Sequence, residues 1–566
     1  MRLLGIALLL AAQVSLPAQD KSRETAIVQW RDHRVGLFVH WGVATGRALP
    51  QSHSHARRSE LNPSGSVPAG VYDQYYKEFN PAQYDPDAWL KLAHEAGMRY
   101  AVFVAKHHDG FSMYRSAVNP YNIMATPYGK DVAAMFAEAC KRQGLALGWQ
   151  ISPKDWRNPD FNTHRHDRYN AFYEKVIEEL ATQYGPLTAM WFDGIEPVGP
   201  EKWKGTPERV AAFLHRTQPG IMLSNHGGAP EDFVSFEAMV GPFDRKQPWE
   251  MTEQINPSGW VFNKPMPTRP FRELLRNLVY TISRDGNYLL DIGPMQDGRL
   301  YPPDAERLQE FAAWMKINAE GVHGTRGGPF RDGDWGGATC KGPSVYLFLS
   351  DRVGTELALP AIAAKVRAAR RLDGGPLQFK ADRGGLHLTM PDRKGSRPVF
   401  LGVKLELDRA AFDLPVVDVQ TNLAAQARIV PSSVRSGWGV EGLFDNLGDT
   451  AWDPDGDDLA SSLDFDLGKA QPVGGMSFSQ RTQRLGWHQY YRYELKVRNS
   501  ENEPWQNVYQ GRSCLGGIPV LELKPVRARY LRLEIVKPRN TVPVQLAELR
   551  IFAPLLGAAA SSSDER

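Results

Sequence analysis

Short apolar runs alternate with longer amphipathic stretches between about residues 29 and 325, a pattern typical of repeated βα units. The strand candidates are seven apolar runs, at 35–39, 100–105, 145–151, 189–192, 221–223, 233–236 and 288–292. Four of the amphipathic stretches are helix candidates, at 86–96, 131–143, 168–183 and 271–284. In the last of these, Leu274, Leu278 and Ile282 recur every four residues, which predicts one apolar stripe facing a sheet.

This pattern predicts an α/β unit over residues 19–326, a complete or slightly irregular TIM-type (β/α)8-like barrel. A doubly wound open sheet is the competing fold, but no glycine-rich phosphate loop follows the first run. Glycine-rich segments with short alternating runs then predict two β-sandwich domains, a small antiparallel one at 327–415 and another at 427–554. The tail at 555–566, rich in Ala and Ser, is predicted to be disordered.

Polar residues follow four of the apolar runs in chain order. In a barrel the carboxyl ends of all strands lie on one face, where active sites are found. An Asp-Gly pair such as Asp193-Gly194 is by itself equally typical of a turn. Because four strand ends carry polar groups, we interpret them together as a site, made of His40-Trp41-Gly42, Lys106-His-His-Asp-Gly110, Ser152-Pro-Lys-Asp-Trp156 and Asp193.

Composition narrows the class of protein. The chain has 566 residues, 42% of them hydrophobic and 23% charged, as in ordinary globular proteins of several domains. The net charge of +3 and the lack of a Lys/Arg-rich block argue against a polyanion as partner. The 15 Trp and 20 Tyr suit stacking on sugar rings as well as core packing.

The N-terminus indicates export. Met1-Arg2 is followed by an apolar stretch at 3–12 and small residues up to Ala18, so residues 1–18 are predicted to be a signal peptide of a periplasmic or secreted protein. No later segment is long and apolar enough to be predicted as a membrane span. The three cysteines lie far apart and are expected to be mostly buried free thiols, although one disulfide is an open alternative.

The histidines admit two interpretations. Neighbouring residues of a strand point to opposite faces, so His107 and His108 are not expected to bind one metal ion together. Neutral imidazoles that hydrogen-bond sugar hydroxyls are favoured, with Trp41 as a ring on the sugar face. For each histidine taken alone, a structural role is the alternative. A glycosidase also needs a second carboxyl near Asp193, and the candidates are Glu196, Glu237, Glu250 and Glu253.

Five segments together resemble the α-L-fucosidases of glycoside hydrolase family 29: Trp30 to Gly42, Val104 to Phe111, Ser152 to Trp156, Trp191 to Gly194 and Gly286 to Pro294. The resemblance implies a retaining mechanism without a metal or other cofactor, with Asp193 as nucleophile. It also implies that His40, His107 and His108 bind fucose hydroxyls and that Trp191 lies beside the sugar. By their places in or beside matched positions, Trp156 and His226 are further substrate-binding candidates.

The resemblance leaves the acid/base open between Glu237, which follows the run at 233–236, and Glu250, which has a Trp-Glu context. We prefer Glu237, whose task requires a raised pKa. The chain departs from the family in the loop after the first strand, where His53-Ser-His55 replaces a Glu-Trp pair, at 149–151, and at Asn225-His226. These departures leave open an α-L-galactoside or a sulfated fucoside, and His53, His55 and Arg57 would suit a sulfated or otherwise acidic neighbour.

The block at 427–554 resembles a discoidin-like sandwich of the type found in carbohydrate-binding module family 32, through Leu443-Phe-Asp-Asn446, residues 463–468 and residues 528–534. Asp445, Asp449 and Glu548 are expected to frame a structural calcium, with a metal-free acidic loop as the alternative. The sequence therefore predicts an exported retaining exo-α-L-fucosidase acting on fucosylated oligosaccharides or polysaccharides. A catalytically silent carbohydrate-binding protein on the same fold is the alternative.

Overall fold

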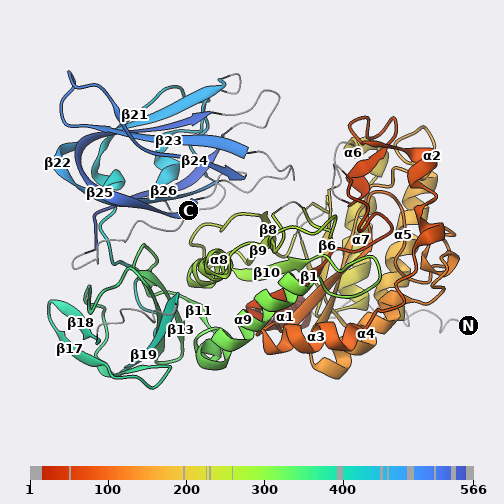
Figure 1. Cartoon of the computed structure of the whole chain (residues 1–566), viewed down its shortest axis with the longest axis horizontal. Helices are drawn as coiled ribbons and strands as arrows, with labels where there is room; N and C mark the ends of the chain where they lie inside the picture. The colour runs from red at the N-terminus through yellow and green to blue at the C-terminus, as the bar shows by residue number, and fades with distance from the viewer. Residues whose placement is uncertain are drawn as a thin grey trace, which may run out of the picture.

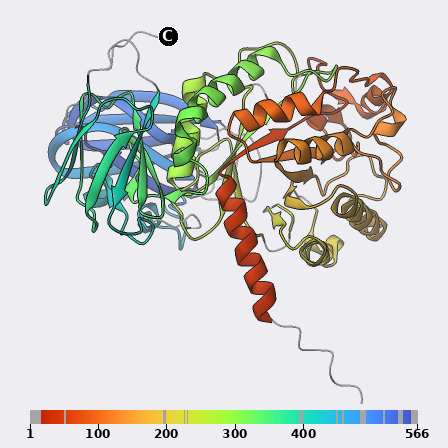
Figure 2. The same cartoon turned by 90° about the horizontal axis from the view of Figure 1, so that it is seen from below.

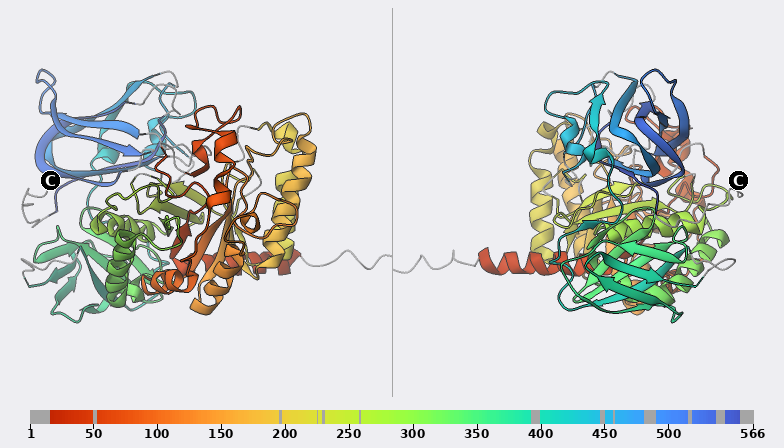
Figure 3. Two further views of the ribbon diagram at one scale, coloured as in Figure 1. Left: turned by 45° about the vertical axis from the view of Figure 1, so that its right-hand side comes forward. Right: turned by 90° about the vertical axis from the view of Figure 1, so that its left-hand side faces the viewer.

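The computed structural model describes a barrel and two β-rich units (Figure 1). Both β-rich units lie on one side of the barrel (Figure 3). The residues described are 16–49, 53–194, 198–224, 226–228, 231–257, 259–391, 399–445, 450–455, 458–480, 490–514, 518–536 and 544–555.

Eight parallel strands form the barrel, in the order β7-β6-β5-β4-β1-β10-β9-β8. One parallel bridge between Ser224 and Phe233 joins the two ends of this series, so the sheet closes on itself. In chain order the strands are β1 (Val35–Val39), β4 (Tyr100–Lys106), β5 (Ala146–Ile151), β6 (Leu187–Phe192), β7 (Met222–Leu223), β8 (Val234–Glu237), β9 (Trp249–Gln254) and β10 (Asn287–Ile292).

The predicted TIM-type barrel is confirmed, and seven of its strands correspond to the seven apolar runs. The eighth, β9, was missed because Glu250, Thr252 and Glu253 make its sequence polar. All its residues are nevertheless buried, and its two glutamates find tyrosine hydroxyl donors: Tyr100 bonds Glu250 and Tyr288 bonds Glu253.

Helices surround the sheet where the sequence supplies caps and apolar stripes. The Asp85 and Asp131 side chains accept N–H groups of the first turns of α3 and α4, and Gly144 ends α4 in the left-handed conformation. Leu274, Leu278 and Ile282 of α8 are fully buried, as predicted. The bounds are α3 (Pro86–Glu95), α4 (Val132–Gln143), α5 (His166–Gln183), α6 (Pro200–Trp203), α7 (Thr206–Thr217), α8 (Phe271–Ser283) and α9 (Pro302–Asn318).

The first helix, α1 (Leu16–His33), closes the bottom of the barrel and projects away from it at its N-terminal end (Figure 2). Trp30 packs on Phe233 with ring centroids 4.6 Å apart. Arg23 pairs with Asp232 and donates to the Ile221 carbonyl. None of the helices in the described ranges is both long and apolar enough to cross a membrane.

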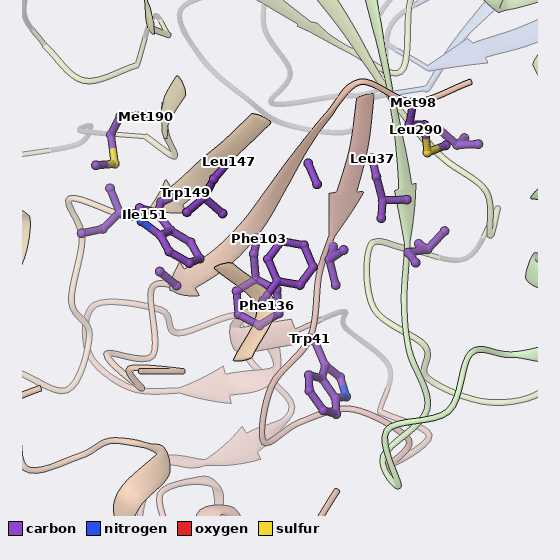
Figure 4. Packing of buried hydrophobic residues seen from close by; sticks show 14 of the residues in the cluster. Leu37, Trp41, Met98, Phe103, Phe136, Leu147, Trp149, Ile151, Met190 and Leu290 are labelled. Atoms are coloured by element: carbon purple, nitrogen blue, oxygen red, sulfur yellow. The ribbon is translucent and has the colours of Figure 1, made fainter. Parts of the chain in front are cut away.

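Strand alternation divides the barrel's apolar residues into two layers. Phe38, Val102 and Leu289 fill the interior, while Leu37, Phe103 and their neighbours face the helices. Figure 4 shows part of this outer layer, in which Phe103 packs on Phe136 of α4 with centroids 5.0 Å apart.

The small β unit consists mainly of a five-stranded and a three-stranded sheet. Its core includes Trp335, Leu347 and Leu388. The first sheet contains β11 (Arg326–Gly327), β13 (Gly336–Lys341), β14 (Ser344–Ser350), β19 (Phe400–Leu407) and β16 (Val366–Arg371), and the second β15 (Glu356–Leu359), β18 (Gly385–Thr389) and β17 (Gln378–Asp382).

The C-terminal unit is built on two long strands, β22 (Ala460–Gln480) and β25 (Ile518–Val536), which pair antiparallel with register shifts. These irregularities bend the strands, so that the sheet curls around its own core. The other strands are β21 (Arg428–Pro431), β23 (Tyr490–Arg498), β24 (Gln506–Cys514) and β26 (Leu546–Phe552).

Asp332 connects all three units. Its carboxylate accepts two hydrogen bonds from Arg284 of the barrel, and its carbonyl accepts one from Arg550 of β26. Arg550 also pairs with Asp418 of β20 (Val417–Asp418) at 3.0 Å. Cys140 and Cys340 are buried free thiols, in line with the prediction for them.

Candidate active site

Asp193 directly follows β6, at the carboxyl end of the barrel strands. Its Oδ2 accepts hydrogen bonds from Gln150 Nε2 at 3.0 Å and from His107 Nε2 at 2.8 Å. His108 Nε2 lies 3.6 Å from the same oxygen. The Asp193 side chain keeps 25% of its surface exposed, so a ligand from solvent can reach it.

His107 and His108 both face Asp193, which corrects the expectation that neighbouring residues point to opposite faces. β4 ends at Lys106, and the chain then turns, with the Gly110 N–H bonding the His107 carbonyl. Strand alternation therefore no longer applies at these positions. Each histidine is held from behind by a serine: Ser54 contacts His107 Nδ1, and Ser152 contacts His108 Nδ1.

The surroundings of Asp193 favour its charged form. Burial alone would raise the pKa of its carboxyl. The neighbouring His108 and His107, together with Lys154, have the larger combined effect and hold the pKa well below its usual range. Asp193 is therefore a carboxylate at neutral pH, as a nucleophile must be.

Glu237, the last residue of β8, has the opposite electrostatics. Burial raises its pKa, the charge of Asp193 raises it further, and Lys154 opposes both, with a net value of about 8. The side chain is half-buried. At neutral pH Glu237 thus carries a proton beside an ionised Asp193, which is how a carboxyl pair divides acid and nucleophile roles.

Glu250 does not reach this pair. It is the second residue of β9, lies inside the barrel below the rim with 1% of its surface exposed, and accepts a hydrogen bond from the Tyr100 hydroxyl. Burial raises the pKa of Glu250 to about 8, but the charge of Asp193 is not among the influences on it. The position of Glu250 therefore favours Glu237 as the acid/base, and the choice between the two stays a prediction.

Two other carboxyl candidates do not join the pair either. Glu253 faces the outer layer, where Asn277 and Tyr288 both donate to it at 2.7 Å. Glu196 lies outside the described residues.

Aromatic and imidazole rings form the rest of the pocket. His40 Nδ1 lies 2.6 Å from Asp291 Oδ1, and the His40 ring packs on Trp260 with centroids 5.0 Å apart. Trp156 packs on His108 with centroids 4.8 Å apart. Trp191, one layer below Asp193, is 3% exposed and stacks on His226 at 6.3 Å.

Trp41 is not in the pocket, contrary to prediction. It is fully buried among Phe79, Tyr84 and Trp89, and its indole N–H donates to the Met295 carbonyl at 3.1 Å. Figure 4 shows Trp41 among the buried residues of the outer layer. Because His40 points into the barrel, strand alternation directs the next residue outward. The ring that lies near His40 is instead Trp260.

His53 is a buried side chain of the pocket for which neither ring nitrogen has a hydrogen-bond partner among the described residues. Its ring lies 4.3 Å from that of His107, centroid to centroid. Burial, together with His107 and His40, lowers the pKa of His53 well below its usual value, so the imidazole is neutral. A neutral imidazole offers one donor and one acceptor.

Arg57 is already paired, which removes the basis for a sulfate-binding role. Its guanidinium bonds both oxygens of Asp73, at 2.6 and 2.8 Å, and donates to the Trp156 carbonyl at 2.8 Å. The ion pair fixes the loop that carries His53 and His55 against the third strand end. Arg57 therefore positions the pocket wall and does not supply a positive charge for an acidic substituent.

Gln150 and Trp260 were not among the predicted site residues, and Lys154 was predicted only as part of the motif at 152–156, although all three act at the pocket. Gln150 and Lys154 lie in or next to the motif at 152–156, so alternation along the third run would have pointed Gln150 into the barrel. Trp260 comes from a loop, whose course strand patterns do not determine.

The proposed calcium ligands are only partly described. Asp445 accepts from Thr450 Oγ1 at 2.7 and 2.9 Å, Glu548 lies on β26, and Asp449 is outside the described residues. Within the described ranges, the three-residue grouping with metal-binding geometry is His55, His107 and His108. The calcium site stays a prediction.

The rim of this (β/α) barrel holds an ionised aspartate beside a protonated glutamate, with histidines and tryptophans near them. This arrangement defines a glycoside hydrolase. The sequence profile of the family Alpha-L-fucosidase matches residues 6–320, more than half of the chain, and that of the F5/8 type C domain matches 428–549. The chain thus belongs to the α-L-fucosidase family and carries a C-terminal discoidin-like domain.

Individual relatives agree with this family. Tissue alpha-L-fucosidase of Bos taurus is 26% identical over 363 residues, which cover 56% of this chain and 74% of that protein. Alpha-L-fucosidase isoenzyme 1 from Paenibacillus thiaminolyticus is 28% identical, with a TM-score of 0.61, over 68% of this chain and 100% of that one. The α-L-fucosidase from Vibrio sp. strain EJY3, at 22% identity, shares the fold over 94% of this chain and 98% of its own, with a TM-score of 0.65.

Proposed function

We propose that this chain is a retaining exo-α-L-fucosidase in which Asp193 is the nucleophile and Glu237 the acid/base. The observation that carries the proposal is the opposite shift of two carboxyls at the same rim: the pKa of Asp193 is lowered and that of Glu237 is raised to about 8, in part by Asp193 itself. Each residue is thereby in the protonation state that its role requires at neutral pH.

In the first step an Asp193 oxygen attacks the anomeric carbon while Glu237 gives its proton to the glycosidic oxygen. The bond between that carbon and the glycosidic oxygen breaks, the electron pair stays on the oxygen, and the aglycone leaves as an alcohol. In the second step Glu237 takes a proton from water, the water oxygen attacks the same carbon, and the ester bond to Asp193 breaks. Asp193 is ionised and Glu237 protonated again at the end.

Hydrogen bonds to hydroxyls orient the sugar for this attack. His107 and His108 present imidazoles to Asp193, and the His53 ring packs against His107. The two ring nitrogens of His53 suit one hydroxyl that gives a proton and one that takes a proton. Trp191 below and Trp156 at the side supply apolar surface. Because Arg57 is neutralised by Asp73, an unsulfated sugar fits this pocket better than a sulfated one.

The decisive experiment is hydrolysis of 4-nitrophenyl α-L-fucoside by the purified chain, with 4-nitrophenyl α-L-galactoside as comparison. We expect turnover of the fucoside, loss of it in Asp193→Ala, and release of the α-anomer first in a proton NMR time course. If neither glycoside is hydrolysed, the protein is a silent carbohydrate-binding relative. If only the galactoside is hydrolysed, the sugar specificity is wrong and the mechanism stands.

We further propose that residues 1–18 are removed on export. The support is the charged start, the apolar stretch and Ala18, and Arg23 and Trp30, which contact the barrel, both lie beyond the cut. N-terminal sequencing of the natively produced protein is expected to read from Gln19. A mature protein that begins with Met1 contradicts the proposal.

For the C-terminal unit we propose glycan binding assisted by a structural calcium near Asp445 and Glu548. The support is the discoidin-like fold and the packing of the turn at Val440–Leu443 against β26. Calcium is expected to raise the melting temperature of the full chain, and Asp445→Asn to abolish that increase. An equal increase in both proteins argues against this site.

A further inference from the structure

Three histidines lie at distances from one another that suit a metal ion, and two of them, His107 and His108, also face Asp193. One ring nitrogen from each of His55, His107 and His108 lies within 4.8 Å of the other two. In a tetrahedral zinc site with bonds of about 2.0 to 2.2 Å, ligand atoms are about 3.3 Å apart. The distances from Asp193 Oδ2 to Nε2 of His107 and His108, 2.8 and 3.6 Å, lie on either side of that value.

We propose that His55, His107 and His108 form a binding site for a divalent transition-metal ion such as Zn²⁺ next to the Asp193 carboxylate, and that a bound ion blocks the nucleophile. The ion is an inhibitor in this proposal and takes no part in glycoside hydrolysis. Three imidazoles are a donor set suited to zinc, nickel or copper, whereas magnesium prefers oxygen ligands alone.

In His107 and His108 the second ring nitrogen contacts a polar side chain, as is typical of metal-binding histidines. Ser54 Oγ contacts Nδ1 of His107, and Ser152 Oγ contacts Nδ1 of His108, so that both Nε2 atoms face Asp193. Such contacts behind the ligands fix the ring orientation and the tautomer. A serine hydroxyl accepts or donates according to its rotation, so it also suits the tautomer in which Nε2 binds the ion.

One nearby charge opposes a bound cation. Lys154 is the opposing charge, because it acts on Asp193 and His108, and we expect it to weaken metal binding relative to an all-thiolate structural zinc site.

The ion has a route from solvent. His55 is half-buried and the Asp193 side chain is 25% exposed, so the site opens on the side from which the sugar enters. A sugar bonded to His107 and His108 occupies the same nitrogens as the metal. Binding of L-fucose and binding of Zn²⁺ are therefore expected to exclude each other.

The test is calorimetric titration of the metal-free full chain with ZnCl₂ at fixed pH, with MgCl₂ as a parallel titrant. We expect one zinc ion per chain and no magnesium binding. His55→Gln and His108→Gln are both expected to reduce zinc affinity at least about tenfold, because each removes one of three ligands, and loss of a residue that only hydrogen-bonds a ligand already reaches that size. His387→Gln, at an exposed histidine of β18, is the matched control and retains wild-type affinity.

Melting curves of each variant separate ligand loss from misfolding, and using two ligand variants keeps the test valid if one of them does not fold. Zinc binding of wild-type strength in both His55→Gln and His108→Gln overturns the site, as does equal loss in His387→Gln. Zinc binding that saturating L-fucose leaves unchanged overturns the blocking role. The metal titration does not depend on turnover, so it remains decisive even if the protein hydrolyses no fucoside.

Discussion

Nε2 of His107 lies 2.8 Å from Oδ2 of Asp193, and this contact helps to keep the nucleophile ionised. The active form of the enzyme has Asp193 charged and Glu237 protonated. The pH profile of kcat/KM is therefore expected to be bell-shaped, with an acidic limb below the ordinary carboxyl range and an alkaline limb near pH 8, where Glu237 loses its proton. In His107→Gln the acidic limb shifts to higher pH; an unmoved limb contradicts the role of this contact.

Replacing the acid/base separates the two glutamate candidates. Glu237→Gln is expected to lower kcat by about 10²- to 10⁴-fold on a fucoside with a poor leaving group, because the leaving oxygen is no longer protonated. Sodium azide restores turnover by attacking the glycosyl-enzyme without a base. Glu250→Gln is the control, and rescue by azide in that variant alone shows that Glu250 is the acid/base.

Glu250 is predicted to make the stability of the barrel depend on pH. Its pKa of about 8 in the folded chain exceeds the ordinary value, so the stability it contributes is complete below about pH 4.5 and is lost as the pH rises to 8. Glu250→Gln removes this dependence. The difference in melting temperature between Glu250→Gln and wild type should therefore be more positive at pH 8 than at pH 5. A difference that does not change with pH speaks against a buried protonated Glu250.

Trp41 and Trp260 should respond differently to substitution. Trp41→Ala creates a cavity among Phe79, Tyr84 and Trp89, and is expected to lower the free energy of barrel unfolding by about 3 to 5 kcal/mol. At a temperature where it remains folded, its KM for the fucoside stays near wild type. Trp260→Ala, next to His40, should raise KM with a smaller loss of stability. The reverse pattern would show that Trp41, and not Trp260, contacts the sugar.

His53 offers a test in which affinity and stability change in opposite directions. His53→Phe keeps a buried ring but removes two polar atoms that lack protein partners, so the melting temperature is expected to stay constant or rise. KM for the fucoside should rise, because sugar hydroxyls lose their partner. A destabilised variant with unchanged KM indicates a structural role for His53.

The alternation of apolar runs with amphipathic stretches predicted most of the barrel, because each apolar run forms a buried strand and each apolar stripe forms the buried face of a helix. It failed at β9, where Glu250 and Glu253 are buried. Their partners, Tyr100 and Tyr288, stand on other strands, and only the folded barrel brings donors and acceptors together. Alternation was also misleading for His107 and His108, because it holds within a strand and ends where the chain turns.

What the sequence determined by itself is the order of strands, the polar groups at their ends and the segments shared with a glycosidase family, since these depend on residue type and spacing along one chain. The tertiary structure decided which carboxyl accompanies Asp193, which tryptophan faces the pocket, and that His107 and His108 both approach one oxygen of Asp193. Those relations depend on the register and curvature with which distant strands meet. Burial and charge then shift the pKa values of the two carboxyls apart, an effect that arises only between side chains brought into proximity by the closed barrel.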